Sequence, residues 1–508
     1  MSTTLALVAS VSPMNVDAGM ILAAAWWLAF WTALGLCIGS FLNAVIYRIP
    51  RNRSLRRPVW SFCPHCKRPI HWYDNIPILS FVLLKGKCRR CGAFISTRYV
   101  AVEAMMALIV LMLLDAFFIG QARSGLADGQ FGLTDQLGYD WPILIAHVVL
   151  FACLLSMSAI DLEHYWVDIR FTNVATIVGF VLHTLWTPRH SAQWVRPTDT
   201  AAVVSLFALI GLAAVWLWYV CRALTSAEAE DDPEPAPMDE LDTQFDKSDA
   251  AFRAIFEPRS RVAGWATVLC LLATFAVLLA DEMGLADLRH TGRALFALVV
   301  FAILVVAESS IPRPSDQLIA DVIEEERPRA RATVLSEMMM LSPAILAGAA
   351  AWWMMARGGE LPDHIANALH TPLRGHWNPL MGFATAASGY IIAGALGWAI
   401  RIGFTLLFGK EAFGTGDIHL MAAAGCVVGW PLVVLGFFLT CFLATVGWVL
   451  TLPIKRTRAL PLGPWLSLSF LAMVVFYNQV IEWPFIERAV QLGRMLLGAG
   501  GFGAAGLN

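Results

Sequence analysis

The chain has 508 residues, of which 58% are hydrophobic and only 15% are charged. Soluble domains carry about 25% charged residues, so this composition predicts a polytopic membrane protein and excludes an ordinary soluble enzyme. The net charge of −2 indicates no class of partner, because acidic and basic residues are concentrated in different loops.

Apolar runs of about 20 residues predict an all-α protein with about twelve membrane spans. They fall at 20–46, 99–118, 142–160, 169–187, 200–221, 262–281, 291–307, 336–356, 382–408, 417–429, 431–453 and 462–480. The tenth is too short to cross a bilayer, and we expect a half-helix inside the protein. Residues 1–17 contain no Lys or Arg, so the first run is expected to be a retained span rather than a signal peptide.

Four cysteines between the first two spans form the most informative motif. They are arranged as C-P-H-C, 21 further residues and C-R-R-C, at Cys63, Cys66, Cys88 and Cys91. Two thiolate pairs at this spacing are typical of a tetrahedral Zn²⁺ site in a small zinc ribbon. Two unrelated pairs, or two disulfides, are the alternative. His65 is a further possible ligand, although four thiolates suffice.

The distribution of basic residues predicts the orientation. Residues 47–98 contain twelve Lys or Arg and one acid, whereas residues 119–141 contain one basic residue and three acids. This asymmetry places the zinc loop in the cytoplasm and the N-terminus outside. Lys455, Arg456 and Arg458 mark a second cytoplasmic loop, in agreement with the count of spans. A reducing cytoplasm argues against disulfides.

Two polar segments interrupt the apolar pattern. Residues 226–261 are acidic and rich in proline, which is typical of a disordered cytoplasmic linker. Residues 313–335 contain E-E-E-R-P-R-A-R-A and are compatible with an interfacial helix. We expect no catalytic role for either segment.

Two aspartates at the membrane edge are catalytic candidates, because carboxylates are costly there. Asp161 follows an apolar run, and Asp417 ends a G-T-G-D sequence that includes Gly414 and Gly416. We expect the glycines to allow close approach of another helix and turns that other residues cannot adopt. If the carboxylates face each other, repulsion keeps one protonated and one ionised, and such a pair activates water without a metal. Alternatively, each aspartate merely ends a helix.

Other polar residues near these aspartates have open roles. Asp168 is either a supporting carboxylate or the N-cap of the next span. His419 is expected on a helix surface rather than in the site. Glu163 and His164 are expected to face water.

The ordered motifs resemble those of bacterial type IV prepilin leader peptidases, which process pilins and type II secretion pseudopilins. The N-terminal blocks are G-S-F-L-N-A-V-I-Y-R-I-P at 39–50, S-F-C-P-H-C-K-R-P-I at 61–70, N-I-P-I-L-S at 75–80, G-K-C-R-R-C at 86–91, S-T-R-Y at 96–99 and Glu103. The sequences A-I-D-L at 159–162 and G-K-E-A-F-G-T-G-D at 409–417 resemble the two active-site segments of the family. L-G-P-W at 462–465 resembles a block near the family's C-terminus.

This resemblance implies that Asp161 and Asp417 are an aspartyl dyad and that the four cysteines bind zinc. It implies an endopeptidase of the bacterial inner membrane that cuts a short basic leader from prepilins or pseudopilins at the cytoplasmic face. The expected partners are these substrates and the bilayer, with no nucleic acid. Many members also methylate the new N-terminus with S-adenosylmethionine, an activity linked to the zinc-bearing domain. This chain has no glycine-rich nucleotide-binding motif, so methyl transfer is implied by the resemblance alone.

Two features depart from the family pattern. Val167 precedes Asp168 where the family usually has proline. Asp161 and Asp417 are 256 residues apart, several times the usual separation, and the excess corresponds to residues 200–375. Four inserted spans are an even number, so they return the chain to the same side and leave an eight-span family core.

These expectations divide the chain into six segments. In order, they are an external N-terminus and first span (1–46), a cytoplasmic zinc domain (47–98), a membrane core with the first aspartate (99–199), the inserted spans and linker (200–375), a membrane core with the GTGD motif (376–485) and a tail (486–508). Two other functional classes remain open. A proton- or cation-coupled transporter would show internal repeats, and none is convincing. An inactive assembly factor of a pilus or secretion system would not need both aspartates.

Overall fold

The computed structural model is all-helical, as the sequence predicts. It describes residues 18–51, 53–55, 60–63, 65–119, 133–164, 167–188, 196–226, 264–280, 289–310, 316–375, 377–411, 413–452, 461–481, 483–484 and 488. Within these ranges there are three isolated β-bridges and no strand. The N-terminus at 1–17, almost all of the linker 226–261, the basic loop at 455–458 and almost all of the tail 486–508 lie outside the described residues.

Among the described residues, seven helices are long and apolar enough to cross a membrane, and five shorter apolar helices accompany them. The long ones are α2 (Ala18–Arg48), α4 (Arg98–Leu114), α5 (Leu133–His164), α7 (Asp199–Ser226), α10 (Asp316–Arg357), α12 (Pro379–Phe408) and α14 (Trp430–Thr451). The shorter ones are α6 (Ile169–Leu185), the helix Gly264–Ala280, α9 (Arg289–Ser310), α13 (Thr415–Val428) and α15 (Gly463–Val475). Together they overlap all twelve predicted spans, and α13 is short, as expected.

Five short helices complete the described elements. They are η1 (Trp72–Asp74), α3 (Leu79–Leu83), η2 (Asp115–Ile119), α11 (Glu360–His370) and α16 (Tyr477–Ile481). The charged stretch 313–335 does not form a separate helix. From Asp316 onwards it is the first half of α10, which runs for 42 residues through Pro328 to Arg357.

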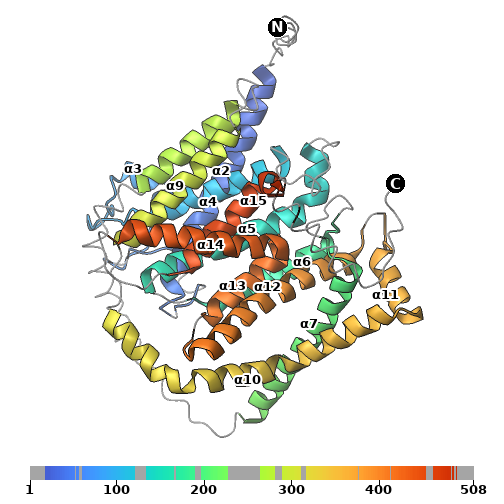
Figure 1. Ribbon diagram of the computed structural model, residues 1–508. Helices are drawn as coiled ribbons and strands as arrows, with labels where there is room; N and C mark the ends of the chain where they lie inside the picture. The colour runs from blue at the N-terminus through green and yellow to red at the C-terminus, as the bar shows by residue number, and fades with distance from the viewer. Residues whose placement is uncertain are drawn as a thin grey trace, which may run out of the picture.

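The helices outside residues 200–375 form a bundle in which neighbouring helices pack through small residues. α2 packs on α4, α5 contacts α6 and α15, and α6, α12 and α13 contact one another (Figure 1). One very close crossing joins α12 to α13: a Cβ atom built on Gly389 would overlap the carbonyl oxygen of Gly425. A side chain at Gly389 would therefore separate the two helices, so glycine is what allows their backbones to touch.

The helices of residues 200–375, the insert expected from the sequence, pack on two sides of this bundle. α7 and α10 contact each other and α12, and the three share an apolar cluster that includes Val203, Met355 and Met381. The helix Gly264–Ala280 and α9 contribute Leu271 and Phe296 to the main core. Figure 1 shows α7 and α10 along the lower edge of the molecule and α9 in its upper part. The insert is thus built into the helical bundle.

A buried ion pair fastens the upper part of the insert. The Nε atom of Arg293 in α9 donates to Oδ2 of Asp115 over 2.6 Å, at the junction of α4 and η2. Both side chains are almost fully buried. Removing one partner would leave the other charge buried and uncompensated, so the pair ties α9 firmly to α4.

Candidate active site and cysteine cluster

Asp161 and Asp417 come together although 256 residues separate them. Asp161 is in the last turn of α5 and Asp417 in the first turn of α13, and these two helices are in contact. The carboxylates are close enough for Asp161 to repel Asp417 electrostatically. Asp161 is 6% exposed, whereas Asp417 is half-buried. A water-activating pair needs this proximity of two carboxylates.

A backbone amide holds Asp161. The N–H of Gly463, the first residue of α15, donates to Oδ2 of Asp161 over 3.1 Å. Amides in the first turn of a helix lack intrahelical partners and carry partial positive charge, so this contact favours an ionised Asp161. Nearby, the Ser158 hydroxyl donates to Oγ of Ser467 over 2.9 Å and joins α5 to α15 a second time. The L-G-P-W block, for which the sequence predicts no chemistry, therefore contacts the candidate site through Gly463.

The glycines of the G-T-G-D sequence are required by packing. A Cβ atom on Gly416 would lie 2.7 Å from the Cβ atom of Val167, in the connection between α5 and α6. Gly414 is the N-cap of α13 with an ordinary φ of −67°, and neither glycine has a positive φ. The expected glycine-only turns are therefore wrong at these positions. The close approach is present, and it is to the Val167 connection rather than to a helix.

Asp168 has the geometry of an N-cap. It precedes α6, and its Oδ1 accepts the backbone N–H of Arg170 over 2.9 Å. Its charge is paired with the Arg170 guanidinium, at 2.5 Å between Nη2 and Oδ2. The same Nη2 donates to the carbonyl of Ile49 over 3.3 Å, which joins this connection to the end of α2. His419 is half-buried on α13, and the side chains of Glu163 and His164 lie outside the described residues.

The four motif cysteines form one cluster. Their Sγ atoms lie within 4.8 Å of one another, and His65 is not part of the group. The sulfurs of Cys63 and Cys91 are 3.9 Å apart, and all four thiols are free rather than disulfide-bonded. Tetrahedral Zn–S bonds of about 2.3 Å place neighbouring sulfurs roughly 3.8 Å apart. The donor set and its spacing therefore fit a zinc ion.

Two equivalent turns present these sulfurs. The N–H of Lys67 donates to the carbonyl of Cys63 over 2.8 Å, and the N–H of Gly92 donates to that of Cys88 over 2.9 Å. An isolated antiparallel bridge closes each turn. Local backbone hydrogen bonds fix the conformation of each cysteine turn. The rest of the domain then determines how the two turns are placed relative to each other.

The thiols differ in how readily they ionise. Backbone N–H groups of Cys91 and Arg90 lower the pKa of Cys88 to about 7. Burial raises the pKa of Cys63 to about 12. Since zinc binds thiolates, its binding at neutral pH must displace the Cys63 proton, and the affinity is expected to fall as the pH falls.

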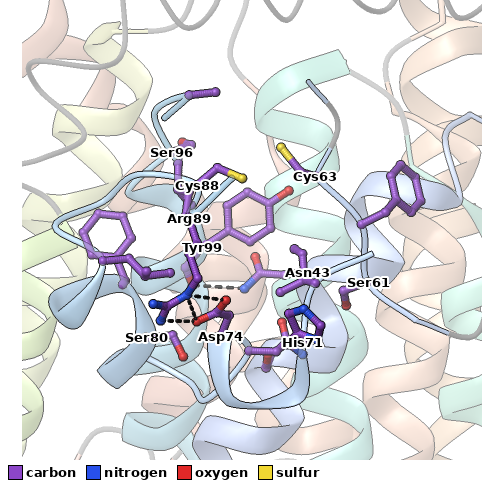
Figure 2. A pocket seen from close by; sticks show the side chains of 18 of the residues that line it. Asn43, Ser61, Cys63, His71, Asp74, Ser80, Cys88, Arg89, Ser96 and Tyr99 are labelled. Atoms are coloured by element: carbon purple, nitrogen blue, oxygen red, sulfur yellow. Dashed lines mark hydrogen bonds and ion pairs between the residues drawn. The ribbon is translucent and has the colours of Figure 1, made fainter. Parts of the chain in front are cut away.

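A cavity of about 710 Å³ lies beside the cysteine cluster (Figure 2). Its walls come from the end of α2, the two cysteine turns, the segment between them and the start of α4. Aromatic rings line it together with polar groups: Tyr47, Phe62, Tyr73, Phe81, Phe94, Tyr99, Asn43, Ser80 and Glu103. This volume is in the range of small-molecule sites. Neither Asp161 nor Asp417 lines it, so the cavity is separate from the aspartate pair.

An ion pair fixes one wall of this cavity. The Arg89 guanidinium, within the second cysteine turn, donates to both carboxylate oxygens of Asp74 at 2.7–3.0 Å, as Figure 2 shows. The hydrogen bonds from Arg89 lower the pKa of Asp74. In another part of the wall, Nδ2 of Asn43 donates to the carbonyl of Tyr99 over 3.0 Å and joins α2 to α4. The cavity therefore has anchored walls on two sides.

A strained residue forms another part of the wall. Ile78 has φ of 58° and ψ of −49°, which a β-branched side chain disfavours. The N–H of Leu79 donates to the carbonyl of Pro77 over 2.5 Å and closes a tight turn around it. Buried Glu103 of α4 accepts the N–H of Ile78 over 2.8 Å. Such strain persists where the surroundings impose it, and it concentrates at functional sites.

Comparisons with known proteins agree with these motifs. Residues 33–117 match the Bacterial Peptidase A24 N-terminal domain, and residues 365–449 match the Type IV leader peptidase family. The first match includes the cysteine cluster and the second includes Asp417. Residues 118–364, with Asp161, lie between the two matches.

Three curated relatives are similar to parts of this chain. The chain is 37% identical over 153 residues to a prepilin leader peptidase/N-methyltransferase of Myxococcus xanthus, covering 30% of this chain and 39% of the relative. It is 35% identical over 168 residues to a type 4 prepilin-like proteins leader peptide-processing enzyme of Escherichia coli, covering 30% and 54%. It is 32% identical over 211 residues to a prepilin leader peptidase/N-methyltransferase of Klebsiella pneumoniae, covering 40% and 78%. The chain thus spans about half or less of the first two relatives and most of the third. No solved structure matches the chain.

Proposed function

The chain belongs to the prepilin leader peptidase/N-methyltransferase family, and from this premise we propose that it is a membrane-embedded aspartic endopeptidase that removes the leader of prepilins or pseudopilins. The observation that carries the proposal is the meeting of Asp161 and Asp417 at the ends of α5 and α13. The helices that carry them are packed together, although 256 residues separate the two aspartates in the sequence.

The surroundings of the two aspartates support different roles. Asp161 accepts the Gly463 N–H at a helix N-terminus, so we assign it the ionised state. Asp417, which Asp161 repels, is assigned the protonated state. Water attacks the scissile carbonyl carbon while Asp161 takes a water proton and Asp417 gives its proton to the carbonyl oxygen. When the resulting diol collapses, Asp161 gives its proton to the leaving amine, the C–N bond breaks, and Asp417 recovers a proton from the diol hydroxyl.

We propose the cavity as the site of the N-methyltransferase activity in the family name. S-adenosylmethionine, when bound, would supply an electrophilic methyl group to the new N-terminal amine. The residues present fit this group. The volume suits a small molecule of this kind, and the wall combines aromatic rings with the polar side chains of Asn43, Ser80 and Glu103. The four cysteines would hold a structural Zn²⁺ that fixes the cavity wall through Arg89.

The proposed location is the bacterial inner membrane, with the cysteine domain and the aspartates on the cytoplasmic side. The basic loop between α2 and α4 supports this orientation. The hydrogen bond from Arg170 to the carbonyl of Ile49 supports a common side, because it joins the connection after Asp161 to the start of the cysteine domain. Substrates with a basic leader and an apolar helix would then meet the site at the membrane surface.

The test is leader cleavage of a model prepilin in membranes that contain wild type, Asp161→Asn or Asp417→Asn. We expect cleavage by wild type and none by either variant at equal protein level. Asp363→Asn, at an exposed position on α11, is the matched control and should cleave normally. Normal cleavage by both dyad variants would refute the assignment. No cleavage by wild type would favour an inactive assembly factor.

A further inference from the structure

Helix α10 of the insert reaches the loop that leads into the G-T-G-D sequence. The contact is made through Arg401 of α12, which is 2% exposed. We propose that Arg401 is a positioning residue that, together with Glu337 of the insert, holds this loop and so sets the place of Asp417. The inference rests on the proposed protease function and deepens it.

Arg401 uses its whole guanidinium fork. Its Nε and Nη2 atoms donate to the two carboxylate oxygens of Glu337 on α10, both over 3.0 Å. Nη1 and Nη2 donate to the carboxylate of Glu411 over 3.1 and 3.0 Å. Nη1 also donates to the carbonyl of Phe413 over 2.6 Å. A two-sided carboxylate clamp of this kind fixes orientation as well as charge, which lysine cannot reproduce.

Two partners of Arg401 lie in the loop before Asp417. Glu411 and Phe413 precede Gly414, the N-cap of α13, so the clamp ends one residue before the N-cap of the helix that carries Asp417. The ring of Phe413 packs edge-on against Phe437 of α14, at 6.0 Å between centroids. The loop is therefore held from α10, α12 and α14 before it enters α13.

A second residue of α10 meets the start of the same loop. Gly409 ends α12 in the left-handed conformation, with φ of 66°. A Cβ atom built on it would lie 3.4 Å from Nη2 of Arg331. Helix α10 thus lies beside the start of the segment 409–413 and reaches its end through Arg401 of α12.

The charges suggest why Glu337 is needed. It lies in the apolar half of α10, where a carboxylate is costly and marks a functional contact. Its side chain is 14% exposed, against 37% for that of Glu411. Glu337, the more buried carboxylate, compensates the charge of Arg401 and orients its guanidinium group. Glu411, the more exposed carboxylate, belongs to the loop whose position is set. Loss of Glu337 would release the Arg401 fork without touching the loop itself.

The experiment compares leader cleavage by wild type, Glu337→Gln, Arg401→Gln and the double variant, with kcat and KM measured separately. Small misplacement of a reacting group lowers the rate by up to about 100-fold, so we expect kcat to fall by about 10-fold or more in Glu337→Gln while KM changes little. The double variant should be no worse than Arg401→Gln, since Glu337 acts through Arg401.

Two further measurements separate positioning from loss of the fold. Arg293→Gln breaks another buried ion pair between insert and core, that with Asp115, and it should leave kcat close to that of wild type at equal protein level. Hydrogen exchange of the amides in 409–416 should accelerate in Glu337→Gln and not in Arg293→Gln. If Glu337→Gln keeps the wild-type kcat and exchange, or if Arg293→Gln loses activity equally, the inference is overturned. If wild type does not cleave, the proposed function fails, and the exchange measurement alone decides the inference.

Discussion

The amide of Gly463 donates a hydrogen bond to Asp161 across 302 residues of sequence. It distinguishes the two aspartates, because Asp161 receives a fixed donor at the N-terminus of α15. It also gives the L-G-P-W block a physical role. A backbone donor fixes the carboxylate without adding a second titrating group to the site.

Substitution of Gly463 by alanine should abolish cleavage. The new Cβ atom would lie 2.8 Å from Oδ2 of Asp161, so the carboxylate or α15 has to move. Leader cleavage in membranes measures the effect, and protein level and zinc content show that the chain still folds. Gly403→Ala is the matched control: nothing lies within 4 Å of its built Cβ atom, and it should retain full activity. Wild-type cleavage by Gly463→Ala would remove the assigned role of this amide.

Gly416→Ala should be inactive for a different reason. Its Cβ atom would lie 2.7 Å from Cβ of Val167, and overpacking of this kind costs about 1–3 kcal/mol and displaces α13. The double variant Gly416→Ala with Val167→Gly removes the clashing side chain and should recover part of the cleavage activity. A Gly416→Ala variant that is fully active, or a double variant no better than the single one, would contradict this reading of the contact.

The sequence predicted those parts of the candidate site that short local motifs indicate. The two cysteine turns and the G-T-G-D sequence are short motifs whose spacing alone indicates their chemistry. The contacts of Gly463 with Asp161 and of Glu337 with Arg401 join segments far apart, so no local pattern indicates them. Glu337 even adjoins the charged stretch that suggested an interfacial helix. The structure places Glu337 in the apolar half of α10, because this helix continues without a break from the charged stretch.

The cysteine cluster should bind one zinc ion per chain. Replacement of Cys63 or Cys88 by serine removes a ligand from a four-sulfur site and should abolish stoichiometric zinc, measured by elemental analysis of the purified protein. Cys441→Ser, at an exposed position on α14, leaves the cluster intact and should keep the metal. Removal of zinc by a chelator should make the segment 60–98 more susceptible to proteolysis, since metal binding and folding of such domains are coupled. Stoichiometric zinc in Cys88→Ser would show that the metal lies elsewhere.

Glu103 should separate the two proposed activities. Glu103→Leu leaves the Ile78 N–H without its acceptor, so the strained turn relaxes and the cavity wall moves. We expect methyl transfer to a processed pilin to be lost, while leader cleavage continues because neither aspartate lines the cavity. Glu103→Gln keeps a carbonyl acceptor at the same place and should retain more methyl transfer than Glu103→Leu.

The variant Ile78→Gly tests the same turn without changing Glu103. Glycine adopts a positive φ at no steric cost, so Ile78→Gly alone should keep methyl transfer. The double variant Ile78→Gly with Glu103→Leu should recover part of the methyl transfer that Glu103→Leu loses. If cleavage and methylation fall together in Glu103→Leu at normal zinc content, the cavity and the dyad are one site and their separation is wrong.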